Sequence, residues 1–147
     1  MYVSRMNILR RACGCLFALL SIYVLSSSSA FAASASLSTD TVNIDVGQNG
    51  SWTISGNDDG NEREFRWSLP SGLHINPGAG SNLNRFRVRS DRGYLQIETN
   101  GGGSFNATVN VSANNAGTYT MQNQRAEINL NPANMAVNVG GAAPAPA

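Results

Sequence analysis

The chain has 147 residues, with 10 basic and 9 acidic side chains and a formal net charge of +1. Three of the ten arginines lie in residues 1–32, so the remainder carries a formal charge of 7 − 9 = −2. A slightly acidic domain lacks the strongly positive surface with which proteins bind nucleic acids. We therefore expect no nucleic-acid partner.

Residues 1–32 have the pattern of a secretory signal peptide. Early arginines precede an apolar run of 14 residues, ACGCLFALLSIYVL, which is shorter than the about 20 residues of a membrane span. Ala30-Phe31-Ala32 has small residues at both recognition positions, so we expect cleavage after Ala32. The protein is expected to be secreted, periplasmic or at the cell surface, with no membrane span in the mature chain.

The mature chain has no cysteine, because Cys13 and Cys15 both lie in the signal segment. Exported domains of this size often use disulfides, so this one must rely on its core. Residues 33–139 are long enough for one domain with a hydrophobic core. The Ala/Pro-rich residues 140–147 are expected to form a flexible tail.

Apolar residues alternate with polar residues repeatedly along the mature chain, which is the period of a β-strand with one buried face. In the run REFRWSL, for example, Phe65, Trp67 and Leu69 would point inward. Glycine- and asparagine-rich turns separate the runs. The pattern predicts an all-β fold, an antiparallel Ig-like β-sandwich of about seven to nine strands, with a closed barrel as the alternative. The clearest runs are 41–46, 51–55, 63–69, 105–112, 126–130 and 135–139.

Two stretches resemble a known family. The first, RWSLPSGLHINPGAG at 66–80, resembles the W-x-L-P-x-G-L-x-I-x-P-x-x-G phrase of immunoglobulin-like repeats in bacterial surface proteins. The second, NNAGTYTMQ at 114–122, is similar to the A-G-x-Y phrase of these repeats, and also to the final hairpin of cysteine-free fimbrial or capsule subunits. The resemblance implies an Ig-like architecture in an extracellular setting, with Trp67 in the core and Tyr119 as a tyrosine corner.

Groups that catalyse reactions are scarce in the mature chain. His74 is the only histidine, and there is no cysteine, no lysine and no G-x-S-x-G nucleophile elbow. Cysteine nucleophiles and Schiff-base chemistry are therefore excluded, and a histidine-based zinc site lacks ligands. His74 lies between two apolar residues of an expected strand and should face solvent. We predict a non-enzymatic protein that needs no cofactor.

The segment NDDGNERE contains the one dense group of acidic residues. Calcium takes six to eight oxygen ligands, which makes Asp58, Asp59, Asn61 and Glu62 candidate calcium ligands. The spacing does not match an EF-hand loop. The other interpretation is a solvated hairpin turn with neighbouring arginines as weak ion-pair partners.

The segment NRFRVRSDRG alternates arginine with apolar residues. As a strand it would present Arg85, Arg87 and Arg89 on one face, and Phe86 and Val88 on the other. Because the planar guanidinium suits carboxylate and phosphate, the three arginines are candidate residues for binding an anion or a partner. The other interpretation is a solvated edge strand whose arginines pair with acids on neighbouring strands.

These features predict an exported structural or adhesive protein of the bacterial cell surface or extracellular matrix, as a subunit or accessory of a fibre. A protein partner or self-association is expected. The alternative is a carbohydrate- or anion-binding module that uses the arginine-lined strand face, with a surface polysaccharide as ligand. A small secreted enzyme built on the acidic segment is a third hypothesis.

The first testable prediction concerns export. The mature chain should begin near Ala33, because the apolar run ends just before the A-x-A site. N-terminal sequencing and the intact mass of the exported protein measure this directly. An exported protein that retains Cys13 and Cys15 would contradict both the cleavage site and the cysteine-free mature chain.

Overall fold

The structure, a computed structural model, describes residues 32–141. Residues 1–31 of the predicted signal segment and residues 142–147 of the Ala/Pro-rich tail lie outside this range. Within 32–141, no helix is long and apolar enough to cross a membrane. The strands are β1 (Ser34–Leu37), β2 (Thr41–Asp45), β3 (Asn49–Asn57), β4 (Glu64–Ser68), β5 (Leu73–Ser81), β6 (Leu83–Arg89), β7 (Tyr94–Thr99), β8 (Ser104–Ala113), β9 (Gly117–Met121), β10 (Asn123–Ala126) and β11 (Met135–Gly140).

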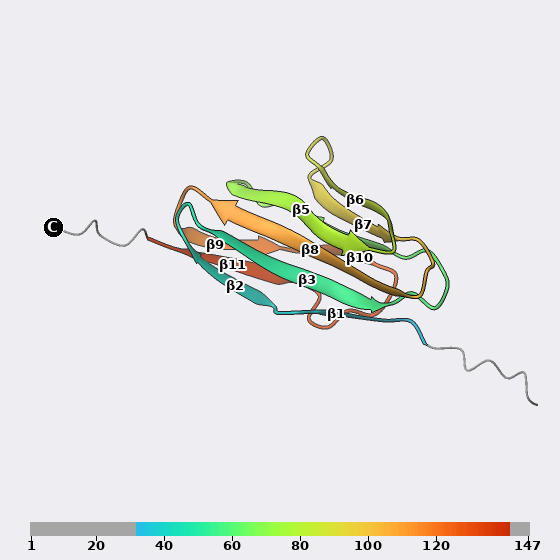
Figure 1. Ribbon diagram of the computed structural model, residues 1–147. Helices are drawn as coiled ribbons and strands as arrows, with labels where there is room; N and C mark the ends of the chain where they lie inside the picture. Colours follow the sequence, from blue (N-terminus) through green and yellow to red (C-terminus); the bar gives the residue numbers. More distant parts are fainter. Residues whose placement is uncertain (1–31, 142–147) are drawn as a thin grey trace, which may run out of the picture. The chain divides into compact units, whose positions relative to one another are not determined.

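The strands form two layers that pack face to face (Figure 1). One layer is the sheet β1-β3-β8-β5, and the other combines the sheets β10-β4-β7-β6 and β2-β11-β9. The last two sheets join because Gln122 alone separates β9 from β10. Ser68 holds this junction: its amide donates to the carbonyl of Gln122, and its hydroxyl accepts from the amide of Gln122, both at 2.9 Å. The fold is an Ig-like β-sandwich, as the sequence predicts.

Two of the strands break and change sheets, which explains why eleven elements replace the expected seven to nine. The N-terminal strand pairs with β3 as β1 and then with β11 as β2. The later strand pairs with β11 as β9 and with β4 as β10. Counted as continuous runs, the strands number 11 − 2 = 9. The β2–β11 pair is parallel, whereas the other pairs between named strands are antiparallel.

An aromatic cluster joins the two layers. Trp52 on β3 meets Trp67 on β4 edge to face, with ring centroids 5.2 Å apart. Phe65 stacks on Trp67 at 6.1 Å and also contacts Phe105 on β8 at 5.7 Å. The indole nitrogen of Trp67 donates to the carbonyl of Ala133 at 2.9 Å, so its polar atom is satisfied although the residue is fully buried. The prediction that Trp67 lies in the core is confirmed.

Tyr119 forms the corner that the sequence predicts. Its hydroxyl donates to the backbone carbonyl of Asn115, four residues earlier, at 3.0 Å. Its ring lies against Gly72, where an added Cβ atom would come within 3.3 Å of the ring. Gly72 also has φ +87°, a conformation that glycine adopts readily. Met121, two residues after the corner, is fully buried.

Two expectations about individual strands are wrong. Residues 126–130 do not form a strand, although Ile128 and Leu130 are buried. The chain leaves the sheet after Ala126, and both side chains enter the core from a loop in which Leu130 makes a single β-bridge to Ala35. Their alternation therefore reflects burial with no continuous strand pairing. Conversely, β7 was not among the expected strands, although Leu95 and Ile97 alternate with Gln96 and Glu98 along it.

The second prediction concerns Trp67. Trp67→Ala should lower the free energy of unfolding by about 3–5 kcal/mol, because it empties the contact between the layers. Chemical denaturation measures the change. Tyr119→Phe is the comparison variant, because it keeps the ring and removes one hydrogen bond worth about 1 kcal/mol. A loss below about 1 kcal/mol for Trp67→Ala would contradict its place in the core.

Candidate functional site

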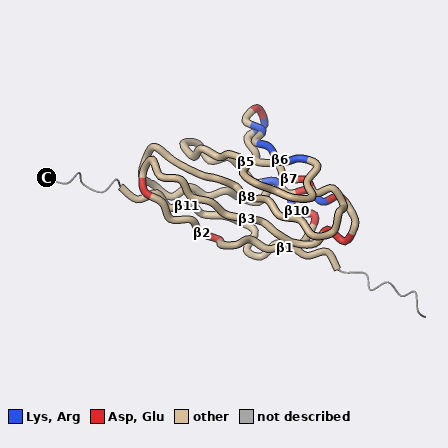
Figure 2. Tube along the Cα trace, viewed as in Figure 1, with Lys and Arg blue, Asp and Glu red and all other residues tan. Residues whose placement is uncertain are grey.

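Charge is concentrated on one part of the sandwich (Figure 2). Strands β1, β3, β5 and β8, which form one layer, contain no Asp, Glu, Lys or Arg. Every arginine of residues 32–141 lies on the sheet β10-β4-β7-β6 or in a loop at its ends. The acids follow the same distribution, apart from Asp40 and Asp45 near β2. The outer face of β10-β4-β7-β6, called the charged face below, is therefore the candidate site.

Strand register arranges the outward side chains of this face in two rows that cross the strands. The two rows are two residues apart along each strand, a separation of about 7 Å. The first row has one arginine and three glutamates, and the second has three arginines and a glutamine. The acidic row consists of Arg85 on β6, Glu98 on β7, Glu64 on β4 and Glu127 just after β10. The basic row consists of Arg87 on β6, Gln96 on β7, Arg66 on β4 and Arg125 on β10.

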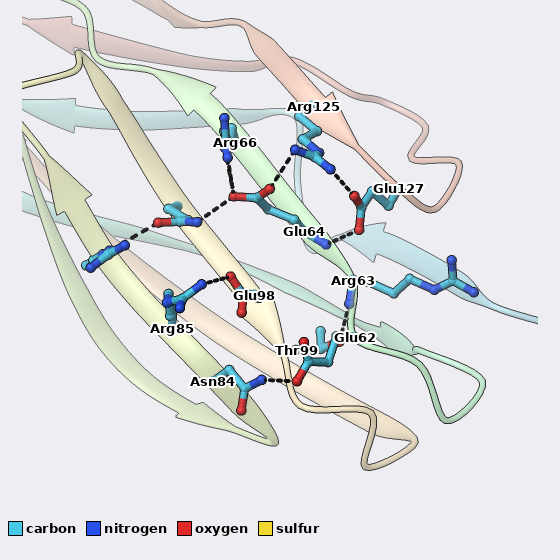
Figure 3. A network of polar contacts seen from close by, with 12 residues as sticks. Glu62, Arg63, Glu64, Arg66, Asn84, Arg85, Glu98, Thr99, Arg125 and Glu127 are labelled. Carbon is cyan, nitrogen blue, oxygen red and sulfur yellow. Dashed lines mark hydrogen bonds and ion pairs between the residues drawn. The ribbon is translucent and has the colours of Figure 1, made fainter.

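Glu64 links the two rows (Figure 3). Its Oε1 accepts from Nε of Arg66 at 2.8 Å and from the amide of Gln96 at 2.5 Å, and its Oε2 lies 2.9 Å from Arg125. Glu127 in turn accepts from the backbone amide of Glu64 at 2.9 Å and pairs with Arg125. The Glu64 residue is 8% exposed. A carboxylate this buried requires such partners, because an unpaired charge would be strongly destabilising.

The three arginines singled out in the sequence lie on the outer side of β6, as the alternation predicts, while Phe86 and Val88 pack partly against the core. Arg85 pairs with Glu98 at 2.6 Å, and Arg89 pairs with Asp91 at 2.9 Å. Arg87 bonds instead to a neutral group, through its Nε to Oε1 of Gln96 at 3.0 Å. Among the described residues, Arg87 thus has no carboxylate partner within salt-bridge distance.

Two side chains of β7, Tyr94 and Gln96, hold guanidinium groups of the basic row in place. Arg66 lies over the ring of Tyr94, with its central carbon 4.8 Å from the ring centroid. Gln96, 4% exposed, accepts from Arg87 and donates to Glu64, so it fixes Arg87 relative to Arg66. An arginine held in one orientation loses less side-chain entropy when it binds a carboxylate. The basic row is therefore prepared to receive acidic groups.

A shallow depression of about 250 Å³ opens beside the acidic row. Glu62 at its rim accepts a hydrogen bond from the Asn84 amide at 2.6 Å. Hydrogen bonds from Arg125 and from the backbone of Glu64 lower the pKa of Glu127, although burial acts in the opposite direction. The depression suits a cationic side chain of a partner in charge and position. It is lined by Glu62, Arg63, Glu64, Glu98 and Glu127.

The four candidate calcium ligands do not converge. Asp58 is buried, and its Oδ1 accepts from the backbone amides of Gly60 and Gly103, which ties two loops together. Hydrogen bonds from Asn61 and Arg63 occupy Asp59 and lower its pKa. Within the described part of the chain, no group of three or more His, Cys, Asp or Glu side chains could hold a metal ion. These residues act as a loop clamp and a surface ion pair.

His74, the one histidine, is exposed on β5 and lies 3.4 Å from the side-chain nitrogen of Asn114. Neither a carboxylate nor a hydroxyl group is among the hydrogen-bond partners found for His74 within residues 32–141. A charge-relay arrangement needs both, with the histidine between them. His74 is therefore best described as an exposed surface side chain.

No family model and no curated protein matches the chain. Among solved structures, the chain is similar to a non-cellulosomal cohesin from the hyperthermophilic archaeon Archaeoglobus fulgidus. The TM-score is 0.53 at 12% sequence identity, and the match covers 74% of this chain and 91% of that chain. At this identity the likeness concerns the fold alone, and it agrees with the β-sandwich described above.

Sequence reasoning missed half of the charged face. Arg66 alternates with the inward residues of the predicted strand 63–69, but Arg125 and Glu127 lie beside or in the segment wrongly predicted as a strand at 126–130. Glu98 and Gln96 lie on β7, which was not among the expected strands. The signal that could have found the face was the outward alternation in 94–99, where Gln96 and Glu98 share one side with Tyr94.

The third prediction concerns Asp91. Hydrogen bonds from Arg89 lower the pKa of Asp91 below its ordinary value of 3.8. NMR titration of the Asp91 carboxyl should therefore give a midpoint below 3.8, and Arg89→Gln should raise this midpoint. Because the folded pKa is below the unfolded one, the pair contributes stability that is present above the unfolded pKa and is lost as the pH falls through the folded pKa.

Arg85→Gln is the control, because Arg85 pairs with Glu98 and not with Asp91. It should leave the titration of Asp91 unchanged. Equal midpoints for Asp91 in the wild type and in Arg89→Gln would show that the ion pair does not form in solution.

Proposed function

We propose that this chain is an exported, non-enzymatic interaction domain with a structural or adhesive role at a bacterial cell surface or in its matrix, and that a protein partner docks on the charged face. The observation that carries the proposal is the segregation of charge. All arginines of residues 32–141 gather on or beside one sheet, while the strands of the opposite layer are uncharged. A charged, preorganised face set on a rigid sandwich favours specific recognition of a partner.

Three further features support this function. The signal segment and the A-x-A site favour export, and the two phrases at 66–80 and 114–122 resemble surface-protein repeats. The surroundings of His74 favour a role without catalysis. The likeness to a cohesin agrees with the β-sandwich on which the charged face is set. Fold alone does not decide function, so the proposal rests on the charged face.

A second candidate function, binding of an acidic surface polysaccharide, is favoured by Arg87. Arg87 is exposed, and within residues 32–141 its guanidinium bonds through Nε to neutral Gln96 and forms no salt bridge, which leaves its terminal nitrogens for a carboxylate. Arg66 in the same row adds a second guanidinium, although it is paired with Glu64. Arg85 and Arg89 are likewise paired with acids.

The fourth prediction separates these two functions. Labelled exported protein is added to cells of the producing strain, with and without protease treatment of the cells. We expect binding that protease treatment abolishes, because the partner is a protein. Arg66→Gln with Arg87→Gln should weaken binding, whereas Ser51→Gln with Ser55→Gln, on the uncharged layer, is the matched control and should bind like the wild type.

Two other outcomes would contradict the protein partner or the surface role. Binding that survives protease, falls with added salt and disappears in the arginine variant would establish the polysaccharide function instead. A protein that stays in the periplasm and binds no cell component would sink the proposed surface role.

A further inference from the structure

The two rows of the charged face carry opposite net charge. The acidic row has one arginine and three glutamates, a formal charge of 1 − 3 = −2. The basic row has three arginines and no acid, a formal charge of +3. The rows run side by side about 7 Å apart. This distance is shorter than the Debye length of about 8–10 Å at moderate salt, so the charges of the two rows interact.

This alternation disfavours a uniform polyanion. A chain of acidic sugars laid on the basic row would bring its charges close to Glu98 and Glu127, which lie in the next row. Like charges at this separation repel, and the depression with its four glutamates adds to the repulsion. A partner that matches the face must offer an acidic row beside a basic row, in the same order and at the same spacing.

We propose that this partner is a second copy of the chain, and that two copies associate through their charged faces. The inference rests on the proposed function, because it names the occupant of the same face. Two-fold symmetry makes an interface isologous, so that each side contributes the same surface. An axis parallel to the rows and midway between them brings the acidic row of each copy opposite the basic row of the other.

The positions that meet under this symmetry lie on the same strand of each copy. Arg66 of one copy faces Glu64 of the other, and Arg125 faces Glu127. On β7, neutral Gln96 faces Glu98, so no like charges meet there. The position on β6 is unfavourable, since Arg87 faces Arg85.

On β6 the repulsion is reduced because Glu98 of one copy, the ion-pair partner of Arg85, also comes close to Arg87 of the other copy. Two of the four facing positions thus pair opposite charges, one places a neutral amide opposite a carboxylate, and one places like charges opposite each other.

The contact is expected to be weak and reversible. Four short strands present less than the about 800 Å² per partner that stable interfaces bury, so we expect a dissociation constant of roughly 10 to 1,000 µM. Raising the salt concentration from 0.05 to 0.5 M should weaken the dimer by about tenfold, because exposed charge pairs are screened. Weak contacts of this kind are strengthened by repetition when many copies sit on one surface.

The decisive experiment exchanges the signs of the rows. In Arg87→Glu with Arg125→Glu, the basic row becomes 1 − 2 = −1, so both rows are negative. In Glu98→Arg with Glu127→Arg, the acidic row becomes 3 − 1 = +2, so both rows are positive. Each variant alone should be monomeric in sedimentation equilibrium, whereas an equimolar mixture should form a dimer, because each negative row then meets a positive one.

Ser51→Glu with Ser55→Glu, on the outer face of β3, is the control and should dimerise like the wild type. Circular dichroism verifies that each variant is folded. If a reversal variant is unfolded, Arg87→Gln with Arg125→Gln serves in its place and should raise the dissociation constant at least about fivefold.

The inference is overturned if the mature wild-type chain stays monomeric up to 1 mM at low salt. It is also overturned if the reversal variants dimerise as well as the wild type, or if their mixture does not associate. Failure of the dimer and failure of the proposed function give different results. A monomer that still binds cells through a protein sinks the dimer alone, while a dimer that binds no cell component sinks the surface role alone.

Discussion

The contact of Trp67 with the rings around it joins the two layers on which the rest of the structure depends. Residues 32–141 contain no cysteine, so no disulfide links the two sheets, and burial of apolar area must hold them together. Trp67 contacts Trp52 from the opposite sheet and Phe65 from its own strand. Its indole nitrogen also anchors the loop at Ala133. One side chain thereby connects both layers and the segment before the last strand.

The inward half of the fold could be read from the sequence because it depends on alternation within single strands. Phe65, Trp67 and the apolar residues of 105–112 point inward as predicted. Alternation gave a wrong prediction where residues are buried without lying on the inner face of a strand. Ile128 and Leu130 enter the core from a loop, and their spacing of two residues matches the period of a strand although they are not part of one. β7 alternates as well, with Leu95 and Ile97 inward and Gln96 and Glu98 outward, but it was not among the expected strands.

The candidate site was only partly predictable, because it is a property of register. Sequence reasoning found a strip of three arginines along β6. Register shows that two of these, Arg85 and Arg89, are paired with acids, and that the third belongs to a row across the sheet. Its companions Arg66 and Arg125 come from segments far away in the chain. Which residues of four strands become neighbours is decided by loop geometry and strand order, which alternation does not encode.

A face that neutralises itself also limits what it binds. Most of its arginines are paired with acids inside the chain, so a stray anion must compete with partners already in place. A partner with matching rows need not displace these pairs, because it extends them into a larger alternating array of charge. Gln96 and Tyr94 hold the guanidinium groups ready beneath this array. The same network that stabilises the buried Glu64 thus fixes the positions of the guanidinium groups, and because the strands of the opposite layer carry no charge, ordered charge within residues 32–141 is confined to this face and the loops beside it.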